Sequence, residues 1–167
     1  MTVELQDAIQ YRTSIRKFKD GKIDTETIGT ILRMGMCAPS ASDKRPWRIW
    51  VVENEDTINS LATATPYATM AHGAPLVIVV GNDAAVSTGM GIIDCSAVIQ
   101  NMLLAVTDLG LGAVWIGCWP HEDRQNNVRQ ILGIPDEIEI VSFIVVGYPA
   151  EMPEPKDKWD PKKVKWM

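Results

Sequence analysis

Residues 91–109 read GIIDCSAVIQNMLLAVTDL, from Gly91 to Leu109. The apolar residues of this stretch cover most of the circumference of an α-helix, so no wide polar stripe remains for water. Such a helix would span about 30 Å, and Gly110 or Gly112 is well placed to end it in a left-handed conformation. We expect a central helix with one side buried by an identical subunit. Burial entirely within one subunit is the alternative.

The flanking sequence alternates between helical and strand patterns. Helices are expected from Thr2 to near Tyr11, from Asp24 to before Pro39, and from Pro120 to Gly133, with helical turns between Thr57 and His72. Strands are expected over 47–52, 75–80, 114–119 and 138–146, and the unbroken apolar run at 75–80 indicates burial on both faces. No repeat or linker interrupts this order. The sequence therefore predicts one α+β (α/β layered) domain over residues 1–167.

Composition narrows the function. The chain has 167 residues, 46% of them hydrophobic and 22% charged, which is typical of a globular domain. A net charge of -5 argues against a general nucleic-acid or membrane surface. Three widely spaced cysteines and two isolated histidines form no metal-ligand or dithiol pattern. The first residues show no secretory pattern, so we expect a cytoplasmic protein whose thiols are reduced and mostly structural.

Two polar segments are candidates for ligand binding. Arg12, Ser14 and Arg16 would face one side of an extended segment, and paired guanidinium groups with a hydroxyl suit a phosphate. A solvated charged turn is the alternative. The proline-bracketed loop 38–46 is rich in side-chain donors, as ligand-binding loops are, although its Ser and Asp residues could instead satisfy the backbone.

Residues 110–119 do not form a dinucleotide fingerprint. These glycines precede a strand, whereas that fingerprint follows a strand and opens a helix. Small residues at Gly117 and Cys118 would instead let a flat ligand approach the backbone. No nucleophile motif such as G-x-S-x-G is present, so an enzyme of this sequence would need a cofactor for the difficult step.

Taken together, the segments resemble the nitroreductase family in order and spacing. The resemblance covers nearly the whole chain and rests on Arg12-Thr13-Ser14-Ile15-Arg16-Lys17-Phe18, Ala38-Pro39-Ser40-Ala41, Pro46-Trp47, residues 99–105 with 109–112, Trp115-Ile116-Gly117, and Gly147-Tyr148-Pro149 before a basic pair.

The resemblance implies a mixed central sheet flanked by helices, in a homodimer with two FMN sites shared between the subunits. Arg12 and Ser14 would hold the flavin phosphate and ribityl chain, joined by two lysines of the tail. Arg16 would lie near the pyrimidine end of the ring, and the backbone of Ile116 and Gly117 near flavin N5. The residues expected to contact FMN are Arg12, Thr13, Ser14, Arg16, Pro39, Ser40, Ala41, Asp43, Trp115, Ile116, Gly117, Lys156 and Lys158, of which Pro39, Ser40 and Ala41 would come from the partner subunit.

The implied activity is a hydride transfer from NADH or NADPH to FMN, followed by reduction of a nitroaromatic, a quinone or an enone. Protein that binds or sequesters FMN without dedicated turnover is the alternative from another class, and a structural dimer without cofactor is a third. A flavin-fragmenting or dehalogenating member of the superfamily is a rival within enzymes, but the chain is too short for the lid on which those activities depend.

Three departures from the family pattern stand out. Asp43 and Arg45 replace the usual Asn and Gln, and the basic pair of the tail is Lys156-x-Lys158 where Lys-x-Arg is common. A lysine cannot reproduce the bidentate fork of an arginine. Only residues 82–90 separate the second strand from the central helix, so we expect an open flavin face. The tail, residues 150–167, is expected to be extended and to pack on a surface or on the partner subunit.

Overall fold

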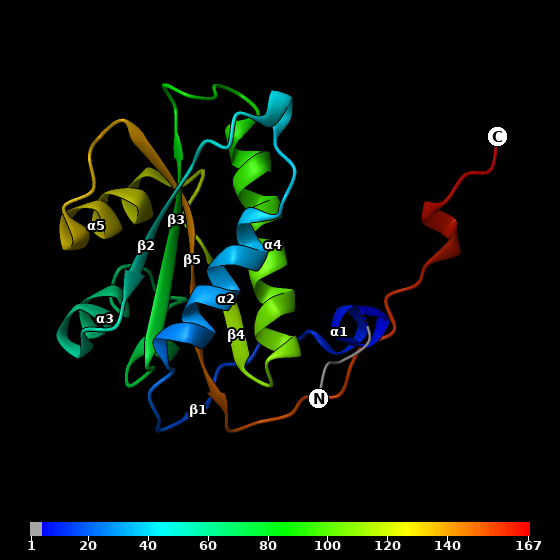
Figure 1. The fold of residues 1–167 in the computed structure, drawn as a ribbon, viewed down its shortest axis with the longest axis horizontal. Coiled ribbons are helices and arrows are strands. Elements are labelled where there is room, and N and C mark those ends of the chain that lie inside the picture. The colour runs from blue at the N-terminus through cyan, green and yellow to red at the C-terminus, as the bar shows by residue number, and fades with distance from the viewer. Residues whose placement is uncertain (1–4) are drawn as a thin grey trace.

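A computed structural model describes residues 5–167 as one sheet between two layers of helices (Figure 1). Short 3-10 turns occur at Ala41–Asp43, Thr69–Ala71 and Pro161–Lys163. The helices and strands follow in the order α1 (Leu5–Tyr11), β1 (Phe18–Lys19), α2 (Thr25–Met36), β2 (Trp47–Val52), α3 (Glu55–Leu61), β3 (Leu76–Asp83), α4 (Gly91–Asp108), β4 (Gly112–Gly117), α5 (Glu122–Leu132) and β5 (Ile138–Pro149).

The apolar stretch forms α4, and Gly110 follows its end with a φ of 72°, as predicted for a left-handed stop. Ile99 and Met102 on its inner face are completely buried, whereas Ile93 on its outer face is 60% exposed in the single chain. By length and composition alone α4 could cross a membrane. Its packing onto the sheet accounts for that hydrophobicity, because half of the helix is buried inside the chain.

The sheet is built around β5. β3, α4 and β4 form a crossover unit whose two strands run in the same direction, and β5 inserts between them antiparallel to both. β2 and the short β1 are likewise antiparallel to their neighbours. The fold class is confirmed, but the ladders within residues 5–167 are all antiparallel instead of mixed. β3 and β4 run in the same direction but do not pair, because β5 lies between them.

Two hydrophobic cores lie on opposite faces of the sheet. Alternate residues of β3 point to each core, with Ile78 and Val80 toward α2 and α4, and Val77 and Val79 toward α3 and α5. β5 is buried on both faces along nearly its whole length. This double burial explains the unbroken apolar runs in the sequence.

Most other predicted elements are present with shifted ends. Asp24 caps α2, its carboxylate accepting from the Thr27 N–H at 2.8 Å. β4 begins and ends two residues earlier than predicted. It ends at Gly117 because the Cys118 and Trp119 N–H groups both donate to the Val141 carbonyl, which interrupts the regular ladder. α5 starts after Pro120, at Glu122. The predicted cap at Thr2 lies outside the described residues.

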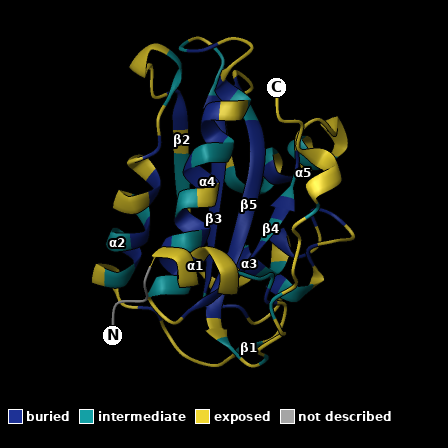
Figure 2. Ribbon diagram, turned by 90° about the vertical axis from the view of Figure 1, so that its right-hand side faces the viewer, coloured by how far each residue is buried: buried dark blue, intermediate teal, exposed yellow. Residues whose placement is uncertain are grey.

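The tail leaves the body on the side of α4 and projects away from it (Figure 1). Figure 2 shows that α1 and the tail are exposed, in contrast to the buried sheet. Trp159 is 70% exposed and Trp166 is 92% exposed, so most of each residue faces solvent in the single chain. Packing of the tail on a partner subunit stays a prediction.

Two valines on neighbouring strands differ in burial and should therefore differ in their contribution to stability. Val79→Ala removes two methyl groups from a completely buried position and should lower the free energy of unfolding by roughly 1–3 kcal/mol. Val51 is 39% exposed on neighbouring β2, and Val51→Ala should cost about 0.5 kcal/mol or less. Urea denaturation of both variants measures the difference, and equal losses would contradict the assigned core.

Candidate functional site

The segment Arg12–Arg16 lies extended along the edge of β4. Ser14 forms a parallel bridge with Ala113, and the Ile15 N–H donates to the Ala113 carbonyl at 2.9 Å. Ile15 is buried, whereas Arg12 and Ser14 are half-buried and Arg16 is exposed. The apolar residue of this extended segment thus faces the protein, while Arg12, Ser14 and Arg16 are more accessible.

Both ends of the chain meet at this segment. Lys156 and Lys158 of the tail line a cleft of about 610 Å³ together with Arg12 and Ser14. We call it the basic cleft, because five of its lining side chains are basic and two are acidic. The full lining is Gln10, Arg12, Thr13, Ser14, Arg16, Lys17, Glu151, Pro153, Glu154, Pro155, Lys156 and Lys158.

Glu151 orders the start of the tail beside the basic cleft. Its carboxylate accepts a hydrogen bond from the Arg16 backbone N–H at 2.7 Å. The Ala150 N–H also donates to the Lys17 carbonyl at 2.8 Å. These two contacts bring the tail lysines to the N-terminal segment. No motif or spacing in the sequence indicated this role for Glu151.

A second cleft, which we call the strand cleft, opens along the end of β4. It has a volume of about 410 Å³, and Arg16 lines both clefts and so joins them. A Cβ atom added to Gly117 would meet no atom within 4 Å. The glycine is thus not required by internal packing, and a flat group could lie against the backbone there. The lining is Arg16, Pro66, Tyr67, Thr69, Met70, Val114, Trp115, Ile116, Gly117 and Arg124.

Loop 38–46 lies apart from both clefts in the single chain. The Ala41 N–H donates to Asp94 at 3.0 Å, which fixes the loop at the N-terminal end of α4. Arg12 lies at the opposite end of that helix, where it lines a small pocket with Leu103 and Thr107. Figure 1 shows α1, which ends just before Arg12, beside this end of α4. One chain therefore does not bring Pro39, Ser40, Ala41 or Asp43 to the other predicted residues. Their contribution from a partner subunit stays a prediction.

Asp43 and Arg45 form an ion pair with each other. The Arg45 Nε donates to Asp43 Oδ1 at 2.7 Å, and this hydrogen bond lowers the pKa of the Asp43 carboxyl. Both side chains are well exposed. Ser42, Asp43 and Arg45 all have φ between 50° and 54°, in the left-handed region that L-residues rarely adopt. Clustered strain of this kind is typical of ligand-contacting loops.

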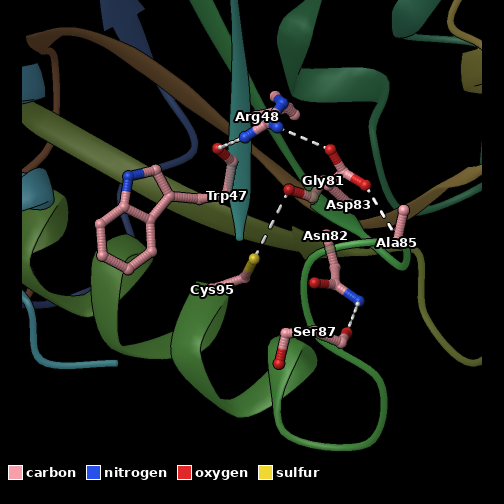
Figure 3. Close-up of polar contacts among 8 residues, drawn as sticks. All are labelled: Trp47, Arg48, Gly81, Asn82, Asp83, Ala85, Ser87 and Cys95. Carbon is pink, nitrogen blue, oxygen red and sulfur yellow. Dashed lines mark hydrogen bonds and ion pairs between the residues drawn. The ribbon is translucent and has the colours of Figure 1, made fainter. Parts of the chain in front are cut away.

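The connection from β3 to α4 is short and held in place. In the described chain, residues 84–90 contain no helix, as expected from the sequence. Asn82 donates to the Ser87 carbonyl at 3.1 Å, and Arg48 pairs with Asp83 at 2.6 Å (Figure 3). Cys95 lies beside the Gly81 carbonyl in the same region (Figure 3). The connection is thus tied to the sheet at its start, away from both clefts.

Tyr67 and Arg124 are two polar side chains of the strand cleft that sequence reasoning missed. Arg124 Nη1 donates to the Gly117 carbonyl at 3.2 Å, and the guanidinium carbon lies 5.1 Å from the centroid of the Tyr67 ring. Neither residue belongs to a recognisable motif. Arg124 lies in the first turn of α5, a few residues after the predicted strand 114–119. This closeness in sequence to Gly117 was the available signal that it could line the same cleft.

Two of the three cysteines are buried, and the described residues form no metal-binding group. Burial raises the pKa of Cys95 and of Cys118 to about 12, so both remain protonated thiols at neutral pH. Cys37 is exposed and free. Within residues 5–167 no group of three or more His, Cys, Asp or Glu side chains could hold a metal ion.

The comparison with known proteins agrees with this geometry. The model of the Nitroreductase family matches residues 9–65 and 62–148. This chain belongs to the nitroreductase family. The match includes the Arg12–Arg16 segment, loop 38–46 and all of β4.

Three relatives in the family are similar to this chain over most of their length. A provisional NADH dehydrogenase/NAD(P)H nitroreductase of Methanothermobacter thermautotrophicus is 41% identical over 98% of this chain and 88% of its own. A crystal structure with the same provisional name, from Bacteroides thetaiotaomicron, is 41% identical with a TM-score of 0.94, covering 97% of this chain and 96% of that one. A provisional nitroreductase of Desulfovibrio desulfuricans, solved in complex with FMN, is 27% identical with a TM-score of 0.86, covering 100% and 98%.

Two glycines of β4 provide a test of the strand cleft. Gly117→Ala should leave stability nearly unchanged, because its Cβ would meet open space, while weakening FMN binding roughly tenfold. Gly112→Ala is the matched control: its Cβ would lie 2.8 Å from Ile15, so it should destabilise the fold. Thermal melts and fluorescence titration with FMN separate the two effects. Unchanged FMN affinity in Gly117→Ala would contradict a ligand at this glycine.

Proposed function

We propose that this chain is an FMN-dependent oxidoreductase that takes a hydride from NADH or NADPH and reduces a small acceptor such as a nitroaromatic, a quinone or an enone. The observation that carries the proposal is the basic cleft. Arg12 and Ser14 from one end of the chain and Lys156 and Lys158 from the other converge there, beside a strand whose glycine leaves room for a flat ring.

The basic cleft suits the phosphate of FMN. Among residues 5–167, the Arg12 guanidinium has no ion-pair partner, so its donors are free for phosphate oxygens. The Ser14 hydroxyl adds a donor beside it. The two tail lysines add positive charge without the geometry of a fork, so they contribute attraction more than orientation.

The strand cleft suits the isoalloxazine ring. Bound there, FMN would supply the hydride-accepting and electron-donating chemistry that the side chains lack. Arg16 lies where the two clefts join and would hold a fixed positive charge at the pyrimidine end, where negative charge develops on reduction. The backbone of Ile116 and Gly117 would face the reacting edge of the ring, with Trp115 in the same strand.

The proposal includes a homodimer with shared sites. Loop 38–46 cannot reach the basic cleft of its own chain because α4 separates them, so a second copy would bring Pro39, Ser40, Ala41 and Asp43 to the ring. Apolar side chains are exposed on α1, α2 and α4, as an isologous interface requires. They are Leu5, Ile9, Met34, Met36 and Ile93.

The short connection between β3 and α4 supports an open flavin face, since residues 84–90 provide no lid helix. Two substrates that bind in turn at one face would then exchange through open solvent. Hydride donor and acceptor would use the same side of the ring, and the reaction needs no protein nucleophile.

Arg12 should determine much of the affinity for FMN. Arg12→Ala removes a charge-assisted contact and should raise the FMN dissociation constant roughly 10- to 100-fold. The loss should shrink at high ionic strength, because the contact is partly screened. Lys19→Ala is the matched control, since this exposed lysine lines neither cleft. Equal losses in the two variants, measured by fluorescence titration, would show that only net charge matters.

The activity itself is tested by anaerobic titration of the purified protein with NADH and NADPH. We expect visible flavin absorbance that bleaches with about one equivalent of nicotinamide and returns when an acceptor is added. Slow bleaching with either nicotinamide would favour a protein that stores FMN without dedicated turnover. A protein that is colourless and does not bind added FMN would refute the proposal.

The dimer is tested at the outer face of α4. Light scattering after size exclusion should give twice the chain mass, and Ile93→Asp should shift the protein toward monomers by burying a charge at the twofold contact. Circular dichroism should be unchanged, because Ile93 is exposed in the single chain. A monomer in the unmodified protein would overturn the shared sites.

A further inference from the structure

The strand cleft contains one cationic group that FMN binding leaves unassigned. Two arginines, Arg16 and Arg124, line this cleft, and no carboxylate lines it. Arg16 is assigned to the pyrimidine end of the ring in the proposed function. Arg124 comes from a different element, α5, and lies beside Gly117, the last residue of β4.

Contacts with Gly117 and Tyr67 hold Arg124 in place but use only one of its N–H donors. One of its five N–H donors bonds to the Gly117 carbonyl, and its guanidinium carbon lies over the Tyr67 ring, 5.1 Å from the centroid. Glu122 and Asp123 share its helical turn, but among the described residues neither forms an ion pair with it. The guanidinium is thus oriented in advance and retains donors for an external anion.

The position of Arg124 connects this charge to the reacting edge. Its hydrogen bond is to Gly117, the residue whose backbone would face flavin N5, so a molecule receiving electrons there lies within reach of the guanidinium. A planar fork of N–H groups matches the two oxygens of a carboxylate. A half-buried site strengthens that attraction relative to open solvent.

We propose that Arg124, oriented by Tyr67 and the Gly117 carbonyl, binds the oxyanion of an anionic acceptor such as an aromatic carboxylate. This inference rests on the proposed function and specifies its substrate class. Arg124 is a specificity-determining residue in this scheme, and neutral acceptors would be reduced without its help. The phosphates of the nicotinamide nucleotide share the same chemistry and are the other source that the experiment must separate.

The experiment compares 4-nitrobenzoate with neutral 4-nitrobenzamide, which has nearly the same shape. In Arg124→Gln, which keeps an amide donor for Gly117, kcat/KM for the carboxylate should fall at least about tenfold, or about 1.4 kcal/mol. The value for the amide should stay within about twofold. Arg124→Lys should recover part of the loss, since it restores charge but not the fork. Arg33→Gln, an exposed position on α2, controls for net charge.

A binding measurement provides a readout besides turnover. Calorimetry on the FMN-saturated protein should give a dissociation constant for 4-nitrobenzoate that rises about tenfold in Arg124→Gln and does not change in Arg33→Gln. Tyr67→Leu should give a smaller loss in the same direction, because it removes the stacking partner of Arg124. This second variant keeps the test informative if Arg124→Gln folds poorly.

Each outcome separates the inference from the function on which it rests. Equal changes for the carboxylate and the amide, or none, would overturn the inference while leaving the oxidoreductase intact. A slower reductive half-reaction with NADH and an unchanged carboxylate-to-amide ratio would assign Arg124 to the nucleotide phosphates and also overturn it. If neither compound is reduced and FMN does not bind, the proposed function fails, and calorimetry with 4-nitrobenzoate on the protein alone still decides whether the cleft binds anions.

Discussion

The insertion of β5 between β3 and β4 is the constraint on which the rest of the structure depends. β5 bonds to both neighbours and is buried on both faces, so it fixes the spacing and register of the sheet. It also leaves the far side of β4 free to pair. The segment Arg12–Arg16 occupies that side through Ser14 and Ala113, which brings Arg16 into the strand cleft at the end of β4.

Much of this could be predicted from the sequence, because burial leaves a periodic signature. The doubly buried strands are unbroken apolar runs, α4 is apolar on nearly all sides, and Asp24 and Gly110 mark helix ends through simple backbone chemistry. Strand order was not accessible in the same way. Whether β5 pairs outside β4 or inserts between β3 and β4 depends on long-range pairing, which local periodicity does not encode.

The residues of the candidate site also fall into those that local sequence patterns indicate and those that depend on long-range contacts. Arg12, Ser14 and Arg16 could be identified from alternation in one extended segment, and Lys156 and Lys158 from the family resemblance. Glu151, Tyr67 and Arg124 could not, because each acts through a contact with a residue distant in the chain. Glu151 reaches Arg16 and Tyr67 reaches Arg124, and neither pairing has a spacing that a single sequence reveals.

The departures from the family pattern also acquire a physical meaning. Asp43 and Arg45 satisfy each other's charge, so replacing two neutral amides by this pair need not place an uncompensated charge beside a ligand. The pair is exposed and sits on a backbone with three left-handed residues, a conformation that the surroundings must over-determine. In the single chain only a few hydrogen bonds do so, among them those from Arg45 N–H to Ser40 and from Ala41 N–H to Asp94. A second subunit packed against this loop would supply the remaining support, because burial would strengthen the ion pair and these backbone contacts together. In the proposed dimer, loop geometry and assembly would then depend on each other, and the strain in this loop would be offset by subunit contacts.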